Sequence, residues 1–299
     1  MHMMDIVGNT PLIELRHFPD IPEGVSLFGK AEFLNPSGSV KDRAVKAMVE
    51  QGIASGRLAP GKTLIDATSG NTGIAYAMTG AVLGFPVKIY LPANANRERK
   101  RMLKIFGAET VETDPLESSD GAYLAAKAEA EAHPEKYFYP DQYNNDENWK
   151  AHYTGTAVEI WEQTQGKITH FISITGTSGT FIGGSRRLKE FSHRIRCVLV
   201  QPDSPFHGIE GTKHLASTLK PGFFDPALAD ETVEVSTEEA TVAVRALARS
   251  EGIFAGLSAG ANLAAALKVC RTLPKGSLAA TILCDTGNRY LSEEFWDFF

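Results

Sequence analysis

Short apolar runs alternate along this chain with longer segments whose apolar residues recur at helical spacing. The short runs are TLIDA (63–67), VKIYL (87–91), FISIT (171–175), CVLVQ (197–201) and TILCD (281–285). Their nearly continuous hydrophobicity predicts strands that are buried on both faces, as in a parallel sheet covered by helices.

The longer segments lie between and beside these runs, at residues 40–52, 73–84, 96–107, 120–132, 153–164 and 261–273. Strand, turn and helix repeated in this order predict an α/β protein with mainly parallel sheets. Because a single hydrophobic core stops growing near 300 residues, the 299 residues of this chain predict two lobes, each with its own sheet.

Charge and composition exclude some classes of protein. The net charge is −6, from 30 basic and 36 acidic residues, and no long basic run occurs, which argues against a nucleic-acid or anionic-membrane surface. The three cysteines have no metal-ligand spacing, so we expect no metal and a reduced, cytoplasmic setting. Neither a signal-like start nor an apolar run of membrane-spanning length is present.

In a parallel sheet, ligands bind beyond the carboxyl ends of the strands, where three turns here are rich in Gly, Ser and Thr. The turn TSGNTG (68–73) offers hydroxyls, an amide and the start of a helix, which together suit a carboxylate or a phosphate. The turn GTSGT (176–180) matches neither a Walker A loop nor a dinucleotide fingerprint, and suits a single phosphate. Taken alone, each is also compatible with an ordinary turn.

The third turn, GLSAG (256–260), matches the G-x-S-x-G motif of α/β-hydrolases. In that fold the catalytic histidine follows the serine in the chain, whereas the last histidine here is His214. The hydrolase alternative is therefore rejected, and Ser258 is predicted to be a neutral hydrogen-bonding group at the start of a helix.

A lysine in the segment NPSGSVKDR (35–43) is the candidate for covalent chemistry. Ser39 is predicted to N-cap a helix whose first turn contains Lys41. The positive end of the helix dipole would lower the pKa of this lysine, as a Schiff-base lysine requires, although a lysine that extends into solvent is the commoner case. Combined with a phosphate-binding turn and an asparagine loop, it suggests pyridoxal 5′-phosphate.

The motifs in their order resemble those of the fold-type II pyridoxal-phosphate enzymes, and within them the cysteine synthases (O-acetylserine sulfhydrylases). The segments that carry the resemblance are VGNTPL, NPSGSVKDR, TSGNTGIA, QYNNDENWKAHYTGTAVEIWEQT, THFISITGTSGT, EGIFAGLSAGANLAAAL and CDTGNRYLS. The segment QYNN…AHY…EIW and the cysteine of CDTGNRYLS are more similar to the B-type isozyme than to the A-type.

The resemblance implies a role for each motif. Lys41 would be the catalytic Schiff-base lysine, Asn71 would bind the phenolic oxygen of the cofactor, and Ser258 would meet its pyridine nitrogen. The predicted phosphate-binding residues are Gly176, Thr177, Ser178, Gly179 and Thr180. The predicted substrate-binding residues are Thr68, Ser69, Gly70, Thr72, Gln142 and Lys213.

Lys213 lies in the segment 205–217, where related enzymes differ in substrate choice. It would supply a positive charge without the bidentate fork of an arginine. A solvated surface lysine is an equally good interpretation of this position.

The implied fold is two-lobed and tryptophan synthase β-like, with a mainly parallel sheet flanked by helices in each lobe. Residues 1–37 and 148–299 would form a large cofactor-binding domain. Residues 38–147 would form a smaller, mobile domain that carries the Schiff-base lysine and the substrate-carboxylate loop. The resemblance also implies a homodimer.

The implied reaction is a β-replacement that makes L-cysteine from O-acetylserine or O-phosphoserine and sulfide or another sulfur donor, through an α-aminoacrylate intermediate. A neutral Ser258 at the pyridine nitrogen suits β-elimination, with Lys41 as general base. The alternatives are a cystathionine β-synthase, a 2,3-diaminopropionate synthase and, less favoured, a dehydratase. A cofactor-free binding protein would have no need for Lys41 and the three loops.

Overall fold

The computed structural model describes residues 1–68 and 70–297, and the chain divides into two compact units. Unit 1 comprises Met1–Val7 and Lys41–Asn148, and unit 2 comprises Gly8–Val40 and the chain from Trp149 onward. Compared with the domains predicted above, Met1–Val7 and Asn148 belong to the unit that contains Lys41, and residues 38–40 belong to the other unit.

Unit 1 is built on a four-stranded sheet in which all neighbouring strands are parallel, in the order β5-β4-β3-β6. The strands are β3 (Thr63–Ala67), β4 (Val87–Pro92), β5 (Glu109–Thr113) and β6 (Tyr137–Phe138). Leu64, Ile65, Asp66 and Ala67 of β3 are all buried, as expected for a central strand covered on both faces.

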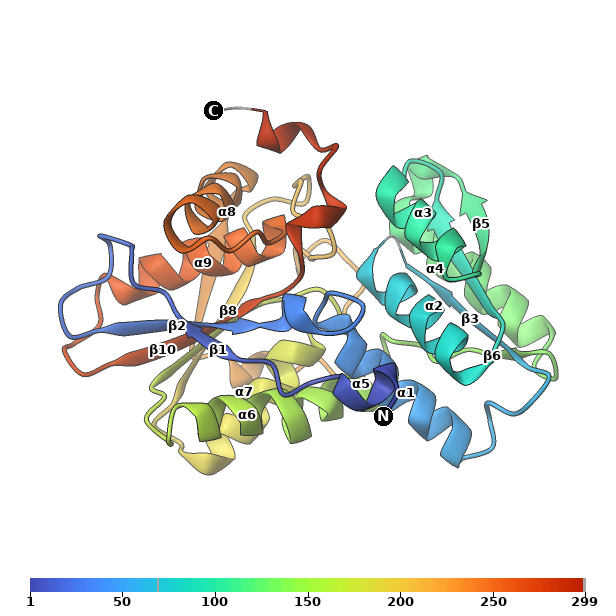
Figure 1. The fold of residues 1–299 in the computed structure, drawn as a ribbon, viewed down its shortest axis with the longest axis horizontal. Helices are drawn as coiled ribbons and strands as arrows, with labels where there is room; N and C mark the ends of the chain where they lie inside the picture. The colour runs from blue at the N-terminus through green and yellow to red at the C-terminus, as the bar shows by residue number, and fades with distance from the viewer. Residues whose placement is uncertain (69, 298–299) are drawn as a thin grey trace. The chain divides into compact units, whose positions relative to one another are not determined.

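Helices cover both faces of this sheet (Figure 1). Apolar side chains of α1 (Lys41–Ala54), α2 (Asn71–Leu83) and α3 (Arg97–Ile105) form one core with Leu64 and Ile89. Alanines of α4 (Ser118–Ala132) form a second core with Ile65 on the opposite face. The short helix η1 (Met3–Ile6) packs against α2, while η3 (Pro115–Glu117) precedes α4.

Unit 2 is built on a six-stranded sheet in the order β1-β2-β10-β7-β8-β9, parallel except for the β1–β2 pair. The strands are β1 (Leu12–Glu14), β2 (Ser26–Ala31), β7 (His170–Ile174), β8 (Arg196–Pro202), β9 (Glu231–Val235) and β10 (Leu278–Leu283). Two apolar cores lie on its two faces, one beneath α8 (Thr237–Glu251) and α9 (Leu257–Cys270), the other beneath α6 (Ala157–Gln163) and α7 (Gly179–Phe191) (Figure 1).

Short helical turns complete the chain. They are η2 (Glu32–Leu34), α5 (Glu147–Ala151), the π-helical turn η4 (His152–Thr156), η5 (Pro226–Leu228), η6 (Gly287–Arg289) and η7 (Glu294–Trp296). No helix in the described ranges is both long and apolar enough to cross a membrane.

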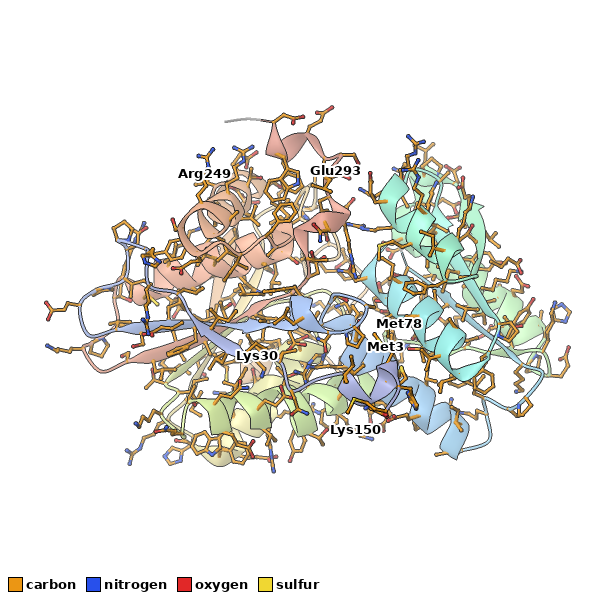
Figure 2. All side chains as sticks on the ribbon, in the orientation of Figure 1. Met3, Lys30, Met78, Lys150, Arg249 and Glu293 are labelled. Atoms are coloured by element: carbon orange, nitrogen blue, oxygen red, sulfur yellow. The ribbon has the colours of Figure 1, made fainter. Side chains whose placement is uncertain are left out.

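A buried ion pair joins strand β2 of unit 2 to helix α6. Lys30 on β2 is fully buried, and its Nζ lies 2.7 Å from a carboxylate oxygen of Glu159 on α6 (Figure 2). Nζ also donates to Oε1 of Gln163 at 2.9 Å, so the buried charge is paired and hydrogen-bonded, as burial requires.

The predicted α/β class with two mainly parallel sheets is confirmed, and each of the five predicted strands is present within a few residues. Two helical predictions need correction. The segment 153–164 is not one α-helix, since it begins within η4 and continues as α6. Helix α8 is absent from the predictions, although Ser236 and Glu239 form a capping box at its start.

Candidate active site

The predicted site residues divide between the two units. Unit 1 contains Lys41, Thr68, Gly70, Asn71, Thr72 and Gln142, and unit 2 contains Gly176, Thr177, Ser178, Gly179, Thr180, Lys213 and Ser258. Ser69 lies outside the described residues. Each group is built by the local structure of its own unit.

In unit 1 the turn from β3 to α2 presents the start of a helix. Thr68 follows β3, and its Oγ1 accepts a hydrogen bond from the backbone N–H of Gly70 at 3.1 Å. Helix α2 begins at Asn71, so the positive end of its dipole lies at this turn. Such a helix start attracts an anion.

Gln142 joins this turn from a distant part of the sequence. Its Oε1 accepts a hydrogen bond of 3.1 Å from the hydroxyl of Thr72, and its Nε2 donates to the carbonyl of Ala67 at 3.1 Å. Asn148 Nδ2 donates to the backbone carbonyl of Gln142 at 2.7 Å. The structure therefore brings together Thr68, Gly70, Thr72 and Gln142, which the resemblance predicts to bind the substrate carboxylate.

Lys41 is the first residue of α1 and is partly buried. Asp42 and Arg43, which follow it, are almost fully buried, so the lysine lies where α1 meets the interior of the unit. Ser39 lies two residues before the helix and pairs with Asp285 in an isolated β-bridge, so it is Val40 that directly precedes α1. The predicted position of Lys41 in the first turn is confirmed.

In unit 2 the turn from β7 to α7 has the conformation of an anion-binding loop. Ser178 immediately precedes α7 with φ +65°, a left-handed backbone that is uncommon for a residue with a side chain. A Cβ atom at Gly176 would lie 2.3 Å from the carbonyl oxygen of Gly211, so only glycine fits there. Strain of this kind, retained at a helix start, is typical of a functional site.

A hydroxyl of this turn fits a phosphate group. Ser178 is 3 % exposed, and its Oγ is buried with no hydrogen-bond partner among the described residues. An unsatisfied buried hydroxyl is costly, and a bound phosphate oxygen would satisfy it. Together with the N–H groups at the start of α7, these residues form a suitable site for one phosphate.

A histidine behind the turn was not predicted from the sequence. His152 is buried on η4, with its Nδ1 2.9 Å from Oγ1 of Thr156 and its Nε2 3.3 Å from Oγ1 of Thr180. The π-helical turn lies against α7, where a Cβ at Gly183 would be 2.0 Å from the carbonyl oxygen of Trp149. A local π turn at such a place often marks a functional site.

Ser258 lies in the first turn of α9 and is 9 % exposed. Asn262, one turn further along, ties the helix to the sheet: its Oδ1 accepts from the N–H of Ile174 at 2.7 Å, and its Nδ2 donates to the carbonyl of Ile282 at 2.8 Å. Ala255 pairs with Thr286 in a β-bridge, so the start of α9 lies beside the end of β10. The first turn of α9, which contains Ser258, is thus anchored beside the ends of two strands.

Lys213 is 8 % exposed, which rules out the alternative of a solvated surface lysine. Its backbone N–H donates to the carbonyl of Thr175 at 2.9 Å, immediately before the 176–180 turn. Its Nζ lies 3.5 Å from the carbonyl oxygen of Leu219, within its own loop. Its predicted contact with substrate stays a prediction.

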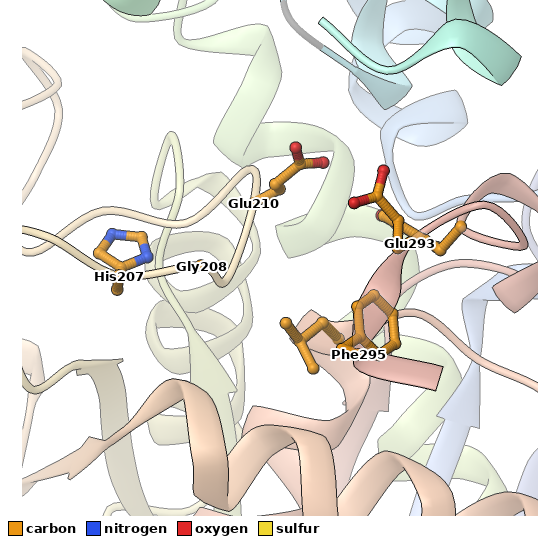
Figure 3. Close-up of a pocket in the computed structure, with 7 residues that line it drawn as sticks. His207, Gly208, Glu210, Glu293 and Phe295 are labelled. Atoms are coloured by element: carbon orange, nitrogen blue, oxygen red, sulfur yellow. The ribbon is translucent and has the colours of Figure 1, made fainter. Parts of the chain in front are cut away.

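A pocket of about 300 Å³ lies in unit 2 beside the segment predicted to govern substrate choice (Figure 3). It is lined by His207, Gly208, Glu210, Leu257, Tyr290, Glu293 and Phe295. The carboxylates of Glu210 and Glu293 lie on the same side of Phe295 (Figure 3). Burial lowers the pKa of His207, so this lining is acidic rather than basic near neutral pH.

The chemistry of these groups fits one cofactor. Among the described residues no cluster of His, Cys, Asp and Glu could hold a metal ion. A lysine at a helix start, a strained single-phosphate turn and a serine hydroxyl are the donor set that pyridoxal phosphate needs. A family model described as "Pyridoxal-phosphate dependent enzyme" matches residues 3–285. The chain belongs to this family.

Pyridoxal phosphate is therefore the cofactor of this protein. Among curated proteins, the chain is 48% identical over 295 residues to a cysteine synthase of Aquifex aeolicus, covering 97% of this chain and 90% of that protein. It is 42% identical over 287 residues to cysteine synthase B of Salmonella typhimurium, covering 96% and 93%. The predicted resemblance to cysteine synthases, including the B-type, is confirmed.

Solved structures give the same fold. Cysteine synthase from Entamoeba histolytica matches with a TM-score of 0.94 and 36% identity over 100% of this chain and 91% of that chain. An O-acetylserine dependent cystathionine beta-synthase from Helicobacter pylori matches with a TM-score of 0.93 and 34% identity over 99% and 98%. The predicted fold-type II architecture is confirmed.

Proposed function

We propose that this protein is a cysteine synthase, which forms L-cysteine from an O-activated L-serine and sulfide in a β-replacement reaction. The observation that carries the proposal is the 48% identity to a cysteine synthase over nearly the whole of both chains. A cystathionine β-synthase activity is not favoured, because the matching structure of that activity is only 34% identical.

The residues of unit 2 would hold the cofactor. Gly176, Thr177, Ser178, Gly179 and Thr180 would bind its phosphate through the strained turn and the start of α7. Ser258 would donate to or accept from the pyridine nitrogen as a neutral hydroxyl. When bound, pyridoxal phosphate supplies an electron sink that makes the Cα proton of an amino acid removable.

The residues of unit 1 would bind and deprotonate the substrate. The start of α2 with Thr68, Ser69, Gly70, Thr72 and Gln142 would receive the substrate carboxylate, because N–H groups and hydroxyls there suit an anion. Asn71 would bind the phenolic oxygen of the cofactor. Lys41 Nζ, at the start of α1, would take the Cα proton as general base.

The bond changes in this reaction balance without a further reactant. Loss of the Cα proton to Lys41 accompanies departure of acetate or phosphate from Cβ. Sulfide then forms the new Cβ–S bond, and the proton returns to Cα.

The proposal is tested with purified protein reconstituted with pyridoxal phosphate. O-acetylserine and O-phosphoserine are each combined with sulfide, homocysteine or ammonia, and the amino-acid products are identified by mass spectrometry. We expect L-cysteine as the main product. Cystathionine or 2,3-diaminopropionate as the main product would contradict the proposal.

Two lysine variants separate chemistry from folding. Lys41→Ala is expected to lower turnover at least about a thousandfold, because general-base and covalent roles each contribute factors of this size. Lys46→Ala, on the same helix, removes only a hydrogen bond of 2.9 Å to the carbonyl of Met4 and is the matched control. Equal activity in both variants would refute the role of Lys41.

We further propose that the protein acts as a cytoplasmic homodimer. The support is the resemblance to cysteine synthases together with Cys197 and Cys270, two buried cysteines that form no disulfide. Burial raises the pKa of both of these thiols to about 11, so they stay protonated and unreactive. Analytical ultracentrifugation that finds a monomer at micromolar concentration would contradict the dimer.

A further inference from the structure

A buried carboxyl group lies directly beneath the turn that begins α2. Asp66, the fourth residue of β3, is 1 % exposed. Its Oδ1 accepts a hydrogen bond of 2.7 Å from the backbone N–H of Ala67, while its Oδ2 is buried with no hydrogen-bond partner among the described residues. The mechanism proposed above does not use this group.

Among the described residues, the groups that act most strongly on Asp66 include no cation. In the sheet it lies opposite Ile89 of β4, and from α2 it faces the fully buried Tyr76. The segment after β6 contributes Tyr139, whose hydroxyl is also buried without a partner in the described chain, and the like charge of Asp141.

Three more titratable groups surround this cluster. Tyr143 also interacts with Asp66 electrostatically, and Asp120 of α4 acts on Tyr143. The ring of Tyr123, also on α4, lies edge-on to that of Tyr143 with centroids 5.3 Å apart. The groups that influence Asp66 are therefore phenols and carboxylates, which do not stabilise a negative charge in the way that a cation would.

A carboxylate without a cation in an apolar interior is strongly disfavoured. Burial is the largest influence on the pKa of Asp66 and raises it from 3.8 to about 7, against the hydrogen bond from Ala67, which lowers it. The neutral acid is therefore the form that fits this position up to neutral pH.

Asp66 and Gln142 both form hydrogen bonds with the backbone of Ala67. The N–H of Ala67 donates to Asp66, and the carbonyl of Ala67 accepts from Gln142 Nε2 at 3.1 Å. Ala67 directly precedes Thr68, whose hydroxyl accepts from Gly70, and Gln142 also accepts from Thr72. One chain of hydrogen bonds thus runs from the buried acid to the start of α2.

We propose that Asp66 is a positioning residue, whose neutral carboxylic acid holds Thr68 and the start of α2 in the geometry that receives the substrate carboxylate and whose ionisation weakens that binding. The inference rests on the proposed function, because it takes this turn as the carboxylate site. A negative charge one peptide group away from the turn opposes a bound anion, and by linkage a bound anion favours the neutral acid.

Two variants and one control test the proposal. Asp66→Asn keeps the acceptor for Ala67 and cannot ionise, whereas Asp66→Ala removes the acceptor. Asp114→Asn removes an exposed carboxylate of the same unit that accepts from the N–H of Leu116 and serves as control. All are compared with the wild-type holoenzyme.

The first measurement is hydrogen–deuterium exchange of peptides that cover residues 64–76. We expect exchange to rise several-fold in Asp66→Ala and to stay at the wild-type level in Asp66→Asn and Asp114→Asn. Unchanged exchange in Asp66→Ala would overturn the positioning role, whatever the enzymatic activity. This measurement needs no substrate, so its result does not depend on whether the proposed function is correct.

The second measurement is the KM for O-acetylserine at pH 6 and pH 8. Ionisation of Asp66 at pH 8 should raise the KM of the wild type. We expect the KM at pH 8 divided by the KM at pH 6 to be about fivefold larger in the wild type than in Asp66→Asn, with similar kcat values. Equal ratios would overturn the effect of ionisation. If no variant consumes O-acetylserine, the proposed function fails and the exchange result alone decides the positioning role. If Asp66→Ala does not fold, the KM ratios of the wild type and Asp66→Asn still test whether ionisation of Asp66 weakens substrate binding.

Discussion

The hydroxyl of Thr72 donates a hydrogen bond of 3.1 Å to Oε1 of Gln142, across 70 positions of sequence. The bond joins the first turn of α2 to the loop that follows β6. Because Gln142 is 5 % exposed and also donates to the carbonyl of Ala67, it links the end of β3 to the first turn of α2.

We predict that Gln142→Ala raises the KM for O-acetylserine about tenfold or more, with a smaller change in kcat. The variant removes two hydrogen bonds that shape the turn and one proposed contact to a carboxylate, and bonds to a charged group contribute about 1.5–3 kcal/mol. Steady-state kinetics check the prediction. Asn144→Ala, an exposed neighbour, is the control and should leave KM unchanged.

The turn 68–72 also shows how far sequence reasoning reaches. The run TSGNTG could be assigned to a strand–helix turn because its chemistry is local: hydroxyls, glycines and a helix start follow one another directly. Gln142 came only from the resemblance to a family, because nothing in its own neighbourhood indicates that it returns to this turn. Contacts between distant residues depend on the packing of β6 beside β3, which no local pattern encodes.

Asp66 was missed for a related reason. The run TLIDA predicts a buried strand, and a single aspartate at a strand end is usually solvated. Its burial results from Tyr76 and the segment after β6, which cover it from two sides. His152 and Asn262 were missed in the same way, since each becomes informative only when its partner on another element is known.

We predict that Ser178→Ala weakens binding of pyridoxal phosphate about tenfold or more. The buried Oγ of Ser178 has no partner within the described chain, so its proposed partner is the phosphate, and a hydrogen bond to a charged oxygen is stronger than a neutral one. Fluorescence or absorbance titration of the apoenzyme measures the affinity. Ser185→Ala, which alters another fully buried hydroxyl on α7, should leave it unchanged.

A glycine at the same position separates the hydroxyl from the backbone. Ser178 has φ +65°, which costs a residue with a Cβ atom about 1 kcal/mol. Ser178→Gly should therefore lose cofactor affinity like Ser178→Ala yet unfold at a higher denaturant concentration. If Ser178→Gly bound the cofactor as tightly as wild type, the hydroxyl would have no role in holding the phosphate.

We predict that Asn262→Ala lowers the free energy of unfolding by about 2–4 kcal/mol. The substitution leaves the N–H of Ile174 and the carbonyl of Ile282 without their side-chain partner in a fully buried place, and each unsatisfied group costs about 1–3 kcal/mol. Urea unfolding of the apoenzyme measures the loss. Asn288→Ala at an exposed position is the control, and a loss no larger than the control's would contradict this account.

We predict that wild-type protein loses stability relative to Asp66→Asn as the pH rises from about 4 to about 7. In the unfolded chain Asp66 titrates at its ordinary pKa of 3.8, whereas burial raises the pKa in the folded state to about 7. Between these values the folded state binds one proton more than the unfolded state, so stability falls with increasing pH. Below the interval both states hold the proton, and above it neither does.

The size of this effect follows from the interval of about three pKa units. Each unit corresponds to about 1.4 kcal/mol, so the wild type should lose up to about 4 kcal/mol that Asp66→Asn does not lose. Urea unfolding of both apoproteins at pH 4.5, 6 and 7.5 measures the difference, since the other carboxylates contribute equally to both. A difference that stays constant across this range would mean that Asp66 is already ionised in the folded protein at the lowest pH. In that case the hydrogen bond with Ala67, and not protonation of the carboxyl group, would stabilise Asp66 in the folded protein.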